Sequence, residues 1–218
     1  AARWVAAACA VAMLVSWGIG EGTRRLSNDL VITFLDVGQG DAALVRFPGD
    51  RTLLIDGGPG RPDGFDAGRF VVAPFLWRRG TTRLDVVAVT HPETDHAGGL
   101  PSVVRLFRPR EIWTARPLED NPVTRRLARA AREVGATVRI LRAGERPMEA
   151  DDCTVDVLWP PADTDGLLPN ERSLVLRIGR GDRAALLTGD LEKQGEAGLL
   201  ASGVDWEPDL LKVGHHGG

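Results

Sequence analysis

The chain is short of cysteine and of lysine, and both shortages restrict its chemistry. Its two cysteines, Cys9 and Cys153, lie in an apolar N-terminal stretch and near an expected strand, so we expect no disulfide, no cysteine-ligated metal and no redox motif. The two lysines, Lys193 and Lys212, leave arginine to carry almost all of the positive charge. The formal net charge of −3 excludes a polycation that coats nucleic acid with its whole surface.

Glycine and proline are abundant, and their number argues against a helical bundle. The 26 glycines and 14 prolines suit many short strands joined by turns. A hydrophobic content of 43% is enough to bury a core, so the chain is expected to be globular. No linker or repeat divides the chain after residue 28, which predicts one domain over residues 28–218.

An uncharged apolar stretch over residues 4–19 precedes this domain, with Trp4 and Trp17 near its two ends. A helix of that length is about 24 Å long, slightly less than the ~30 Å hydrocarbon core of a bilayer. The favoured interpretation is that residues 1–20 end a transmembrane helix of a longer protein; a signal peptide and a buried helix are the alternatives. Because Arg3 precedes the stretch, the favoured interpretation predicts a domain on the outer face of the cell membrane.

Short apolar or alternating runs separated by turn residues predict strands with helices inserted between them. The runs over residues 31–37, 42–47 and 52–55 are typical of an antiparallel meander. A helix is predicted over residues 122–134, because Asn121 is a favourable N-cap and a proline follows it. Further strands are expected at 84–89, 111–114, 137–141, 154–158, 173–178, 183–187 and 209–213, and further helices at 69–79, 97–107 and 192–200. This order predicts an α/β sandwich of two sheets flanked by helices.

Histidine is scarce, and the four that occur form two pairs. His91 and His96 come directly after the run 84–89, and the other two, His215 and His216, follow the run 209–213. Strand ends are where a rigid sheet presents side chains on short loops, so this pairing indicates a shared site.

The first pair lies in a segment rich in metal-binding groups. His91, Glu93, Asp95 and His96 place two imidazoles and two carboxylates within six residues. Imidazole and carboxylate together form a ligand set for Zn²⁺, Mn²⁺ or Fe. The alternative is a plain helix start in which Asp95 is the cap.

These motifs resemble a known family. The segment THPETDHAGGL resembles the HxHxDH signature of hydrolases with the metallo-β-lactamase fold. FLDVGQGDAALVRFPG, LLIDGG, NERSLVL, LLTGDL and KVGHHG follow the order found in the C-terminal domain of the ComEC competence-channel family, which takes up DNA. The resemblance covers residues 30–218 and implies an αββα sandwich, two divalent metal ions and hydrolysis of phosphodiester bonds.

Carried over residue by residue, the resemblance implies metal ligands at His91, Glu93, Asp95, His96, Asn170, Asp190 and His215. Glu93 stands where the superfamily has a second histidine, so it binds metal directly, holds a water or forms a salt bridge. Asn170 stands where many relatives have a third histidine, and a turn cap is its alternative role.

Other positions are assigned roles around these ligands. Asp190 is expected to bridge two ions, although an Asp at a strand end more often caps the next helix. Asp95 and His216 are expected to take part in catalysis, His216 as a phosphate contact or proton donor beside the ligand His215. Asp56 is expected to orient a ligand histidine, because metal-bound imidazole donates its other N–H to an acceptor. Asp41 is a weaker candidate for the same role, since it could also stabilise a hairpin turn.

The expected reaction uses a water that two ions about 3.5–4 Å apart make acidic enough to attack a phosphodiester. The oxygen-rich ligand set favours Mn²⁺ over Zn²⁺. The expected substrate is single-stranded DNA, and Arg125, Arg129 and Arg132 lie on one helix face where they could contact phosphates or remain a solvated surface. The membrane and other competence proteins are the expected partners. Hydrolysis of another phosphodiester such as a phosphocholine ester, a β-lactam hydrolase and a non-catalytic DNA-binding or gating domain are the alternatives.

Overall fold

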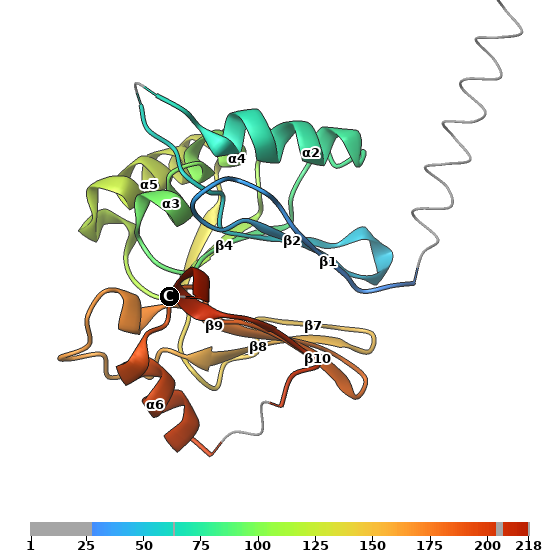
Figure 1. Cartoon of the computed structure of the whole chain (residues 1–218). Coiled ribbons are helices and arrows are strands. Elements are labelled where there is room, and N and C mark those ends of the chain that lie inside the picture. The colour runs from blue at the N-terminus through green and yellow to red at the C-terminus, as the bar shows by residue number, and fades with distance from the viewer. Residues whose placement is uncertain (1–27, 63, 204–206, 218) are drawn as a thin grey trace, which may run out of the picture.

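Two β-sheets face each other between outer helices in the computed structural model, which describes residues 28–62, 64–203 and 207–217 (Figure 1). The apolar stretch predicted at residues 1–20 lies outside the described residues. Within the described ranges, no helix is long and apolar enough to cross a membrane.

The first sheet has six strands in the order of the chain. Its members are β1 (Val31–Phe34), β2 (Ala43–Arg46), β3 (Thr52–Ile55), β4 (Val86–Val89), β5 (Glu111–Thr114) and β6 (Thr137–Ile140). β1, β2 and β3 pair antiparallel, which confirms the predicted meander, and β3 to β6 pair parallel.

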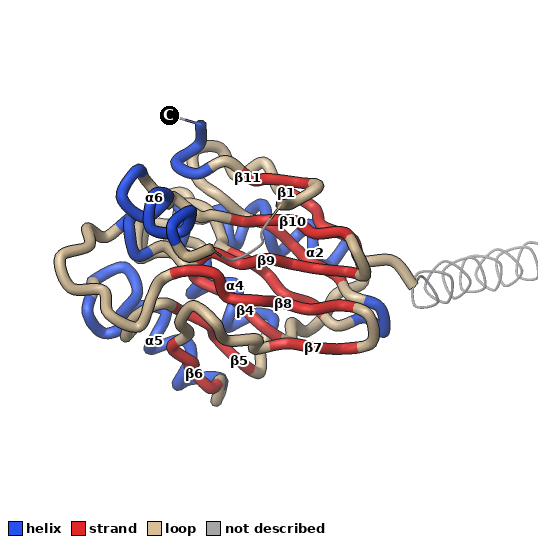
Figure 2. The backbone as a smooth tube through the Cα atoms, turned by 90° about the horizontal axis from the view of Figure 1, so that it is seen from below, coloured by secondary structure: helices blue, strands red, loops and turns tan. Residues whose placement is uncertain are grey.

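The second sheet has five strands in the order β11-β10-β9-β8-β7 (Figure 2). They are β7 (Met148–Ala150), β8 (Cys153–Trp159), β9 (Val175–Arg180), β10 (Arg183–Leu187) and β11 (Leu210–Lys212). β10 and β11 are parallel and the other neighbours are antiparallel. The sequence did not predict β7, because its three residues include a glutamate and are too few to form a recognisable strand pattern.

Helices cover the outer face of each sheet. α2 (Ala73–Arg78), α3 (Thr94–Ala97), α4 (Leu100–Phe107) and α5 (Pro122–Val134) lie on the first sheet, and α6 (Lys193–Ala201) lies on the second (Figure 1). A π-helical turn over Gly68–Val72 precedes α2, and short 3-10 turns occupy Pro48–Asp50, Leu118–Asp120, Asn170–Arg172 and Gly214–Gly217.

The layers of helix and sheet pack together because successive side chains of the central strands point to opposite faces of the sheet. Leu54 and Val87 belong to the core between the helices and the first sheet, whereas Leu53 and Ala88 belong to the core between the two sheets. A strand that is buried on both faces therefore has a continuous apolar sequence. A third cluster, which includes Leu186 and Leu199, joins the second sheet to α6. The predicted αββα sandwich is confirmed.

The predicted helix over 97–107 is divided in two at Gly98 and Gly99. A side chain at Gly98 would lie 2.2 Å from the Thr94 carbonyl oxygen and 2.4 Å from the Gly60 nitrogen. The backbone after β3 therefore packs directly against the end of α3. This contact holds the His96 helix close to the loop that carries Asp56.

Candidate metal centre

The predicted site residues converge because several strands end at one edge of the sandwich. β3 ends just before Asp56 and its parallel neighbour β4 ends just before Thr90 and His91. On the opposite sheet, β10 ends shortly before Asp190, and its parallel neighbour β11 ends at Lys212. Segments far apart in the sequence thus present polar groups to the same space.

A buried cluster of three predicted ligands lies at the centre. His91, His96 and Asp190 are at most 3% exposed, and one ligand atom from each lies within 4.8 Å of the others. His96 Nε2 is 3.3 Å from Asp190 Oδ1, and His91 Nε2 is 3.8 Å from Asp190 Oδ2. The buried Nε2 of His91 has no hydrogen-bond partner among the described residues. Two imidazoles and a carboxylate with a buried nitrogen left over fit a divalent metal ion.

Asp56 and Thr90 fix the orientation of both imidazoles. The Asp56 carboxylate accepts hydrogen bonds from the Thr90 N–H at 2.9 Å, the Thr90 hydroxyl at 2.5 Å and His96 Nδ1 at 2.9 Å. Because the hydroxyl gives its only hydrogen to Asp56, its oxygen accepts from His91 Nδ1 at 3.1 Å. Both rings thus use Nδ1 for support and direct Nε2 toward Asp190, the arrangement of metal-binding histidines.

The charges of the cluster favour a cation. Burial alone would raise the pKa values of Asp56 and Asp190, but the neighbouring imidazoles, His96 above all, lower both. Burial alone would lower the pKa of His96, yet Asp56 and Asp190 raise it to about 10. Burial, followed by the charge of His96, lowers the pKa of His91 to about 4. The two carboxylates therefore stabilise positive charge on the imidazole side of the cluster, and a bound metal ion would supply that charge in place of a proton.

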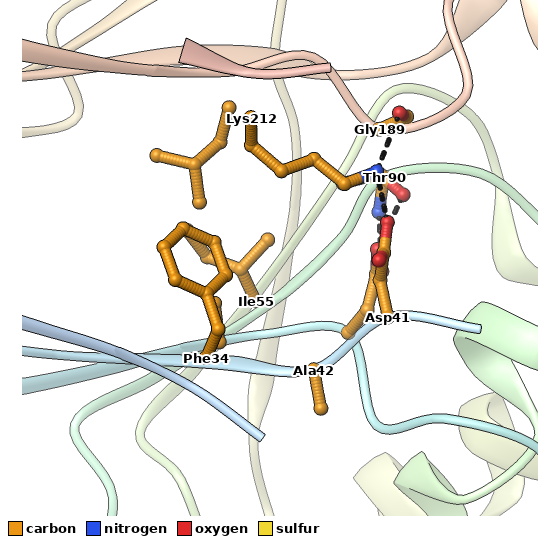
Figure 3. Close-up of a pocket in the computed structure, with 10 residues that line it drawn as sticks. Phe34, Asp41, Ala42, Ile55, Thr90, Gly189 and Lys212 are labelled. Atoms are coloured by element: carbon orange, nitrogen blue, oxygen red, sulfur yellow. Dashed lines mark hydrogen bonds and ion pairs between the residues drawn. The ribbon is translucent and has the colours of Figure 1, made fainter. Parts of the chain in front are cut away.

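The side chains of Lys212, at the end of β11, and Asp41, shortly before β2, point toward each other near Gly189 and Thr90 (Figure 3). The Lys212 ammonium forms an ion pair with the Asp41 carboxylate, donates to the Gly189 carbonyl at 3.0 Å and lies 3.8 Å from Asp190 Oδ1. Asp41 also lies within ligand distance of Asp56 and His96. Since His96 Nδ1 is bonded to Asp56 and Asp41 is paired with Lys212, this second group supports the site and is not where we place an ion.

Asn170 and His215 meet at a second, more open cluster. Both contact one oxygen of Glu192, from Asn170 Nδ2 at 2.9 Å and from His215 Nδ1 at 3.1 Å. The side chain of His215 is 53% exposed and that of Glu192 is 36% exposed, in contrast to the buried cluster. His216 belongs to the 3-10 turn at Gly214–Gly217, but its side chain lies outside the described residues.

Asp95 and Glu93 differ in their distance from the buried cluster. Asp95 Oδ2 is 3.9 Å from His96 Nε2, and the side chain is 34% exposed, so Asp95 lies at the rim. Glu93 is exposed and belongs to neither group of candidate ligands among the described residues. The ligand roles of both residues stay predictions.

The arginine stripe of α5 faces solvent. Arg125, Arg129 and Arg132 are exposed, and Arg132 Nη1 pairs with Glu119 at 3.0 Å. Arg126, on a different face of the helix, bonds instead to the carbonyls of Gly60 and Gly98 at 3.3 Å each. The three exposed arginines are therefore accessible to a polyanion. Arg126 instead anchors α5 beside α3.

Sequence reasoning did not identify Thr90, Glu192 and Lys212 as functional. Each adjoins a residue that it did identify: Thr90 precedes His91, Glu192 follows Asp190 by two residues, and Lys212 opens the motif KVGHHG. Their place in the motifs could have identified them, because polar residues next to a metal ligand often orient that ligand.

A two-sheet sandwich with buried imidazole and carboxylate groups at one edge defines a class of metal-dependent enzymes. The family model described as Metallo-beta-lactamase superfamily matches residues 35–218, and the chain belongs to this superfamily. Members of this fold are generally hydrolytic and bind divalent metal ions, typically two.

The relatives confirm the resemblance to competence proteins. The chain is 32% identical over 203 residues to "ComE operon protein 3" of Bacillus subtilis, covering 88% of this chain and 26% of that protein. It is 30% identical over 191 residues to "Competence protein ComA" of Neisseria gonorrhoeae, covering 87% of this chain and 24% of that protein. The chain thus spans about a quarter of the length of these curated relatives.

Solved structures agree on the fold. CmlA, a diiron β-hydroxylase from Streptomyces venezuelae, matches with a TM-score of 0.54 and 19% identity over 84% of this chain and 34% of that chain. At this identity the match concerns the fold alone, and it carries no information about substrate.

Proposed function

We propose that this domain hydrolyses phosphodiester bonds of DNA with the help of divalent metal ions. The observation that carries the proposal is the buried cluster of His91, His96 and Asp190, with a histidine nitrogen left without a hydrogen-bond partner among the described residues. The similarity to proteins named for competence supports DNA as the substrate.

The residues divide into two candidate sets of ligands. His91, His96 and Asp190 would hold the first ion, and Asp95, Asn170 and His215 would supply donors to a second. Bound ions would supply Lewis acidity, which activates a water and offsets negative charge on phosphoryl oxygens. Mn²⁺ is the proposed metal because oxygen donors predominate in the second set.

The protein's own groups hold this machinery in place. Asp56 and Thr90 keep the imidazoles directed inward, and the Lys212 ammonium pairs with Asp41 and lies near Asp190. His216 is proposed to contact the phosphate. Arg125, Arg129 and Arg132 are proposed to bind the DNA backbone through solvent-exposed charges.

We place the domain on the outer face of the cell membrane, as part of a longer membrane protein that acts with other competence proteins. The support for this placement is the uncharged stretch at residues 4–19 and the fraction of each relative that the chain spans.

A nuclease assay tests the proposal. The purified chain is stripped with EDTA and supplied with Mn²⁺ or Zn²⁺, and cleavage of labelled single-stranded DNA is followed. We expect cleavage with Mn²⁺, loss of cleavage in Asp190→Asn, and normal cleavage in Asp165→Asn, which changes an exposed carboxylate of a loop. Cleavage with Zn²⁺ alone would contradict the metal preference.

Two other outcomes would replace the proposed function. Hydrolysis of a small chromogenic diester without cleavage of DNA would indicate another phosphodiester substrate. A wild-type protein that binds DNA but no metal would indicate a gating domain.

A further inference from the structure

Glu192 occupies the N-cap position of α6, but its carboxylate does not cap that helix. The N–H groups of Gln194 and Gly195 are bonded instead by the buried carboxylate of Glu171, at 3.0 and 2.5 Å. Glu171 thereby satisfies the helix start, a task that usually falls to the N-cap side chain. The Glu192 carboxylate is consequently not needed by its own helix and is directed elsewhere.

The Glu192 carboxylate contacts two predicted metal ligands through one oxygen. Oε1 accepts a hydrogen bond from Asn170 Nδ2 at 2.9 Å and lies 3.1 Å from His215 Nδ1. An ionised carboxylate only accepts hydrogen bonds, so both neighbours must present a donor to it. Nδ1 of His215 therefore carries a hydrogen, and the amide of Asn170 turns its NH₂ group toward Glu192.

This pairing fixes which atoms of His215 and Asn170 point away from Glu192. A neutral His215 with hydrogen on Nδ1 has its lone pair on Nε2. Asn170 turns its NH₂ group toward Glu192, so its Oδ1 lies on the other branch of the amide. A carboxylate behind a histidine is the usual support of a metal-binding imidazole. His215 also has a φ of 45°, a left-handed backbone that non-glycine residues adopt when surrounding contacts hold it.

We propose that Glu192 is a positioning residue for the second metal ion, which aligns His215 Nε2 and Asn170 Oδ1 without binding the ion itself. The inference rests on the proposed function, and it assigns the ligand role in the pair His215-His216 to His215. It gives the open cluster the same design as the buried one, in which Asp56 supports His96.

Metal binding to the full chain tests this role without any substrate. Mn²⁺ is titrated by calorimetry into metal-free wild type, Glu192→Ala and Glu196→Ala, the last of which removes an exposed carboxylate of the same helix. We expect about a 10- to 100-fold weaker binding of one ion in Glu192→Ala and no change in Glu196→Ala. Equal affinities in wild type and Glu192→Ala would overturn the proposal.

A double-mutant cycle tests whether Glu192 acts through its neighbours. In a chain that carries both His215→Ala and Asn170→Ala, adding Glu192→Ala should weaken Mn²⁺ binding no further. A further loss of the same size as in the wild-type background would show that Glu192 binds the ion directly, and would overturn the positioning role. If Glu192→Ala does not fold, Glu192→Gln carries the same tests, because its amide keeps the size but loses the charge.

The tautomer of His215 supplies a readout that needs no metal. Nitrogen chemical shifts of the metal-free protein should show hydrogen on Nδ1 in wild type and a shift toward Nε2–H in Glu192→Ala. An Nε2–H tautomer in wild type would overturn the proposal. Failure of DNA cleavage with intact metal binding would contradict the nuclease function alone, since neither readout involves DNA.

Discussion

The buried cluster around His91 and the open cluster around His215 are built on the same plan but in different surroundings. In the first, Asp56 supports imidazoles that are at most 2% exposed; in the second, Glu192 supports an imidazole that is 53% exposed. Burial removes water from the first cluster, so its ion pairs are strong and its pKa values are shifted far from their usual range. The protein core thus orients the side chains of the buried cluster, whereas a single surface carboxylate orients those of the open cluster.

The largest effect is expected from Asp190→Asn, because the Asp190 carboxylate faces the Nε2 atoms of both buried imidazoles. Removing its charge should lower DNA cleavage by about 1,000-fold or more, since a bound metal contributes several kcal/mol to the transition state. Steady-state cleavage rates with saturating Mn²⁺ measure this loss. A decrease of less than about tenfold would show that the buried cluster is not the centre of the reaction.

The second-largest effect is expected from Asp56→Ala. Asp56 supports the buried imidazoles but is not one of the proposed metal ligands, so its replacement tests the support alone. Asp56→Ala leaves the Thr90 donors and His96 Nδ1 without this acceptor inside the core. We expect a loss of about 3–5 kcal/mol in the free energy of unfolding, measured with urea, as for other broken buried pairs. Glu192→Ala is the matched comparison at the open cluster and should change unfolding by less than about 1 kcal/mol. Equal losses would remove the distinction between the two clusters.

Metal addition is expected to stabilise the folded chain by a moderate amount. At a free Mn²⁺ concentration about 100 times the Kd, the gain is about 2.7 kcal/mol, or roughly 5–10 °C in Tm for a chain of this size. His91→Ala should abolish this shift, whereas His215→Ala should retain most of it, because the buried ion remains. A shift that survives His91→Ala would place the tighter ion at the open cluster. Differential scanning fluorimetry with and without EDTA gives the measurement.

The smallest effect is expected from the arginine stripe, which lies outside both clusters. Replacing Arg125, Arg129 and Arg132 with glutamine should reduce the slope of log affinity for single-stranded DNA against log salt by about 2, or ~0.7 for each phosphate that is no longer neutralised. Metal binding should not change. Filter binding over a range of NaCl concentrations measures the slope, and an unaltered slope would show that the stripe does not contact DNA.

The sequence predicted the grouping of the buried cluster better than the contacts of the open cluster. The buried cluster follows from runs such as residues 84–89, whose apolar pattern places the next residues at a strand end. The residues around Glu192 and His215 lie in turns, where no periodic pattern fixes a side-chain direction. Glu192 was predicted only as the first residue of a helix over residues 192–200, and its contacts became visible only in the structure, where the distant Glu171 caps α6 in its place.

The fold was predictable for a similar reason. The strands at Thr52–Ile55 and Arg183–Leu187 were predicted with their observed bounds, because turn residues border them on both sides. The break between α3 and α4 was not predicted, since it depends on contact between Gly98 and Gly60, which are distant in the sequence. Long-range backbone contacts of this kind leave no local trace except a glycine.

The ion pair between Asp41 and Lys212 joins residues from near the two ends of the described chain: Asp41 lies between β1 and β2 of the first sheet, and Lys212 ends β11 of the second. The centre it borders likewise takes His91 from one sheet and Asp190 from the other. A growing polypeptide consequently cannot assemble this centre until Asp190 has been made and the second sheet has packed on the first. A metal ion that needs side chains from both sheets would therefore bind only after the two sheets have formed and packed together.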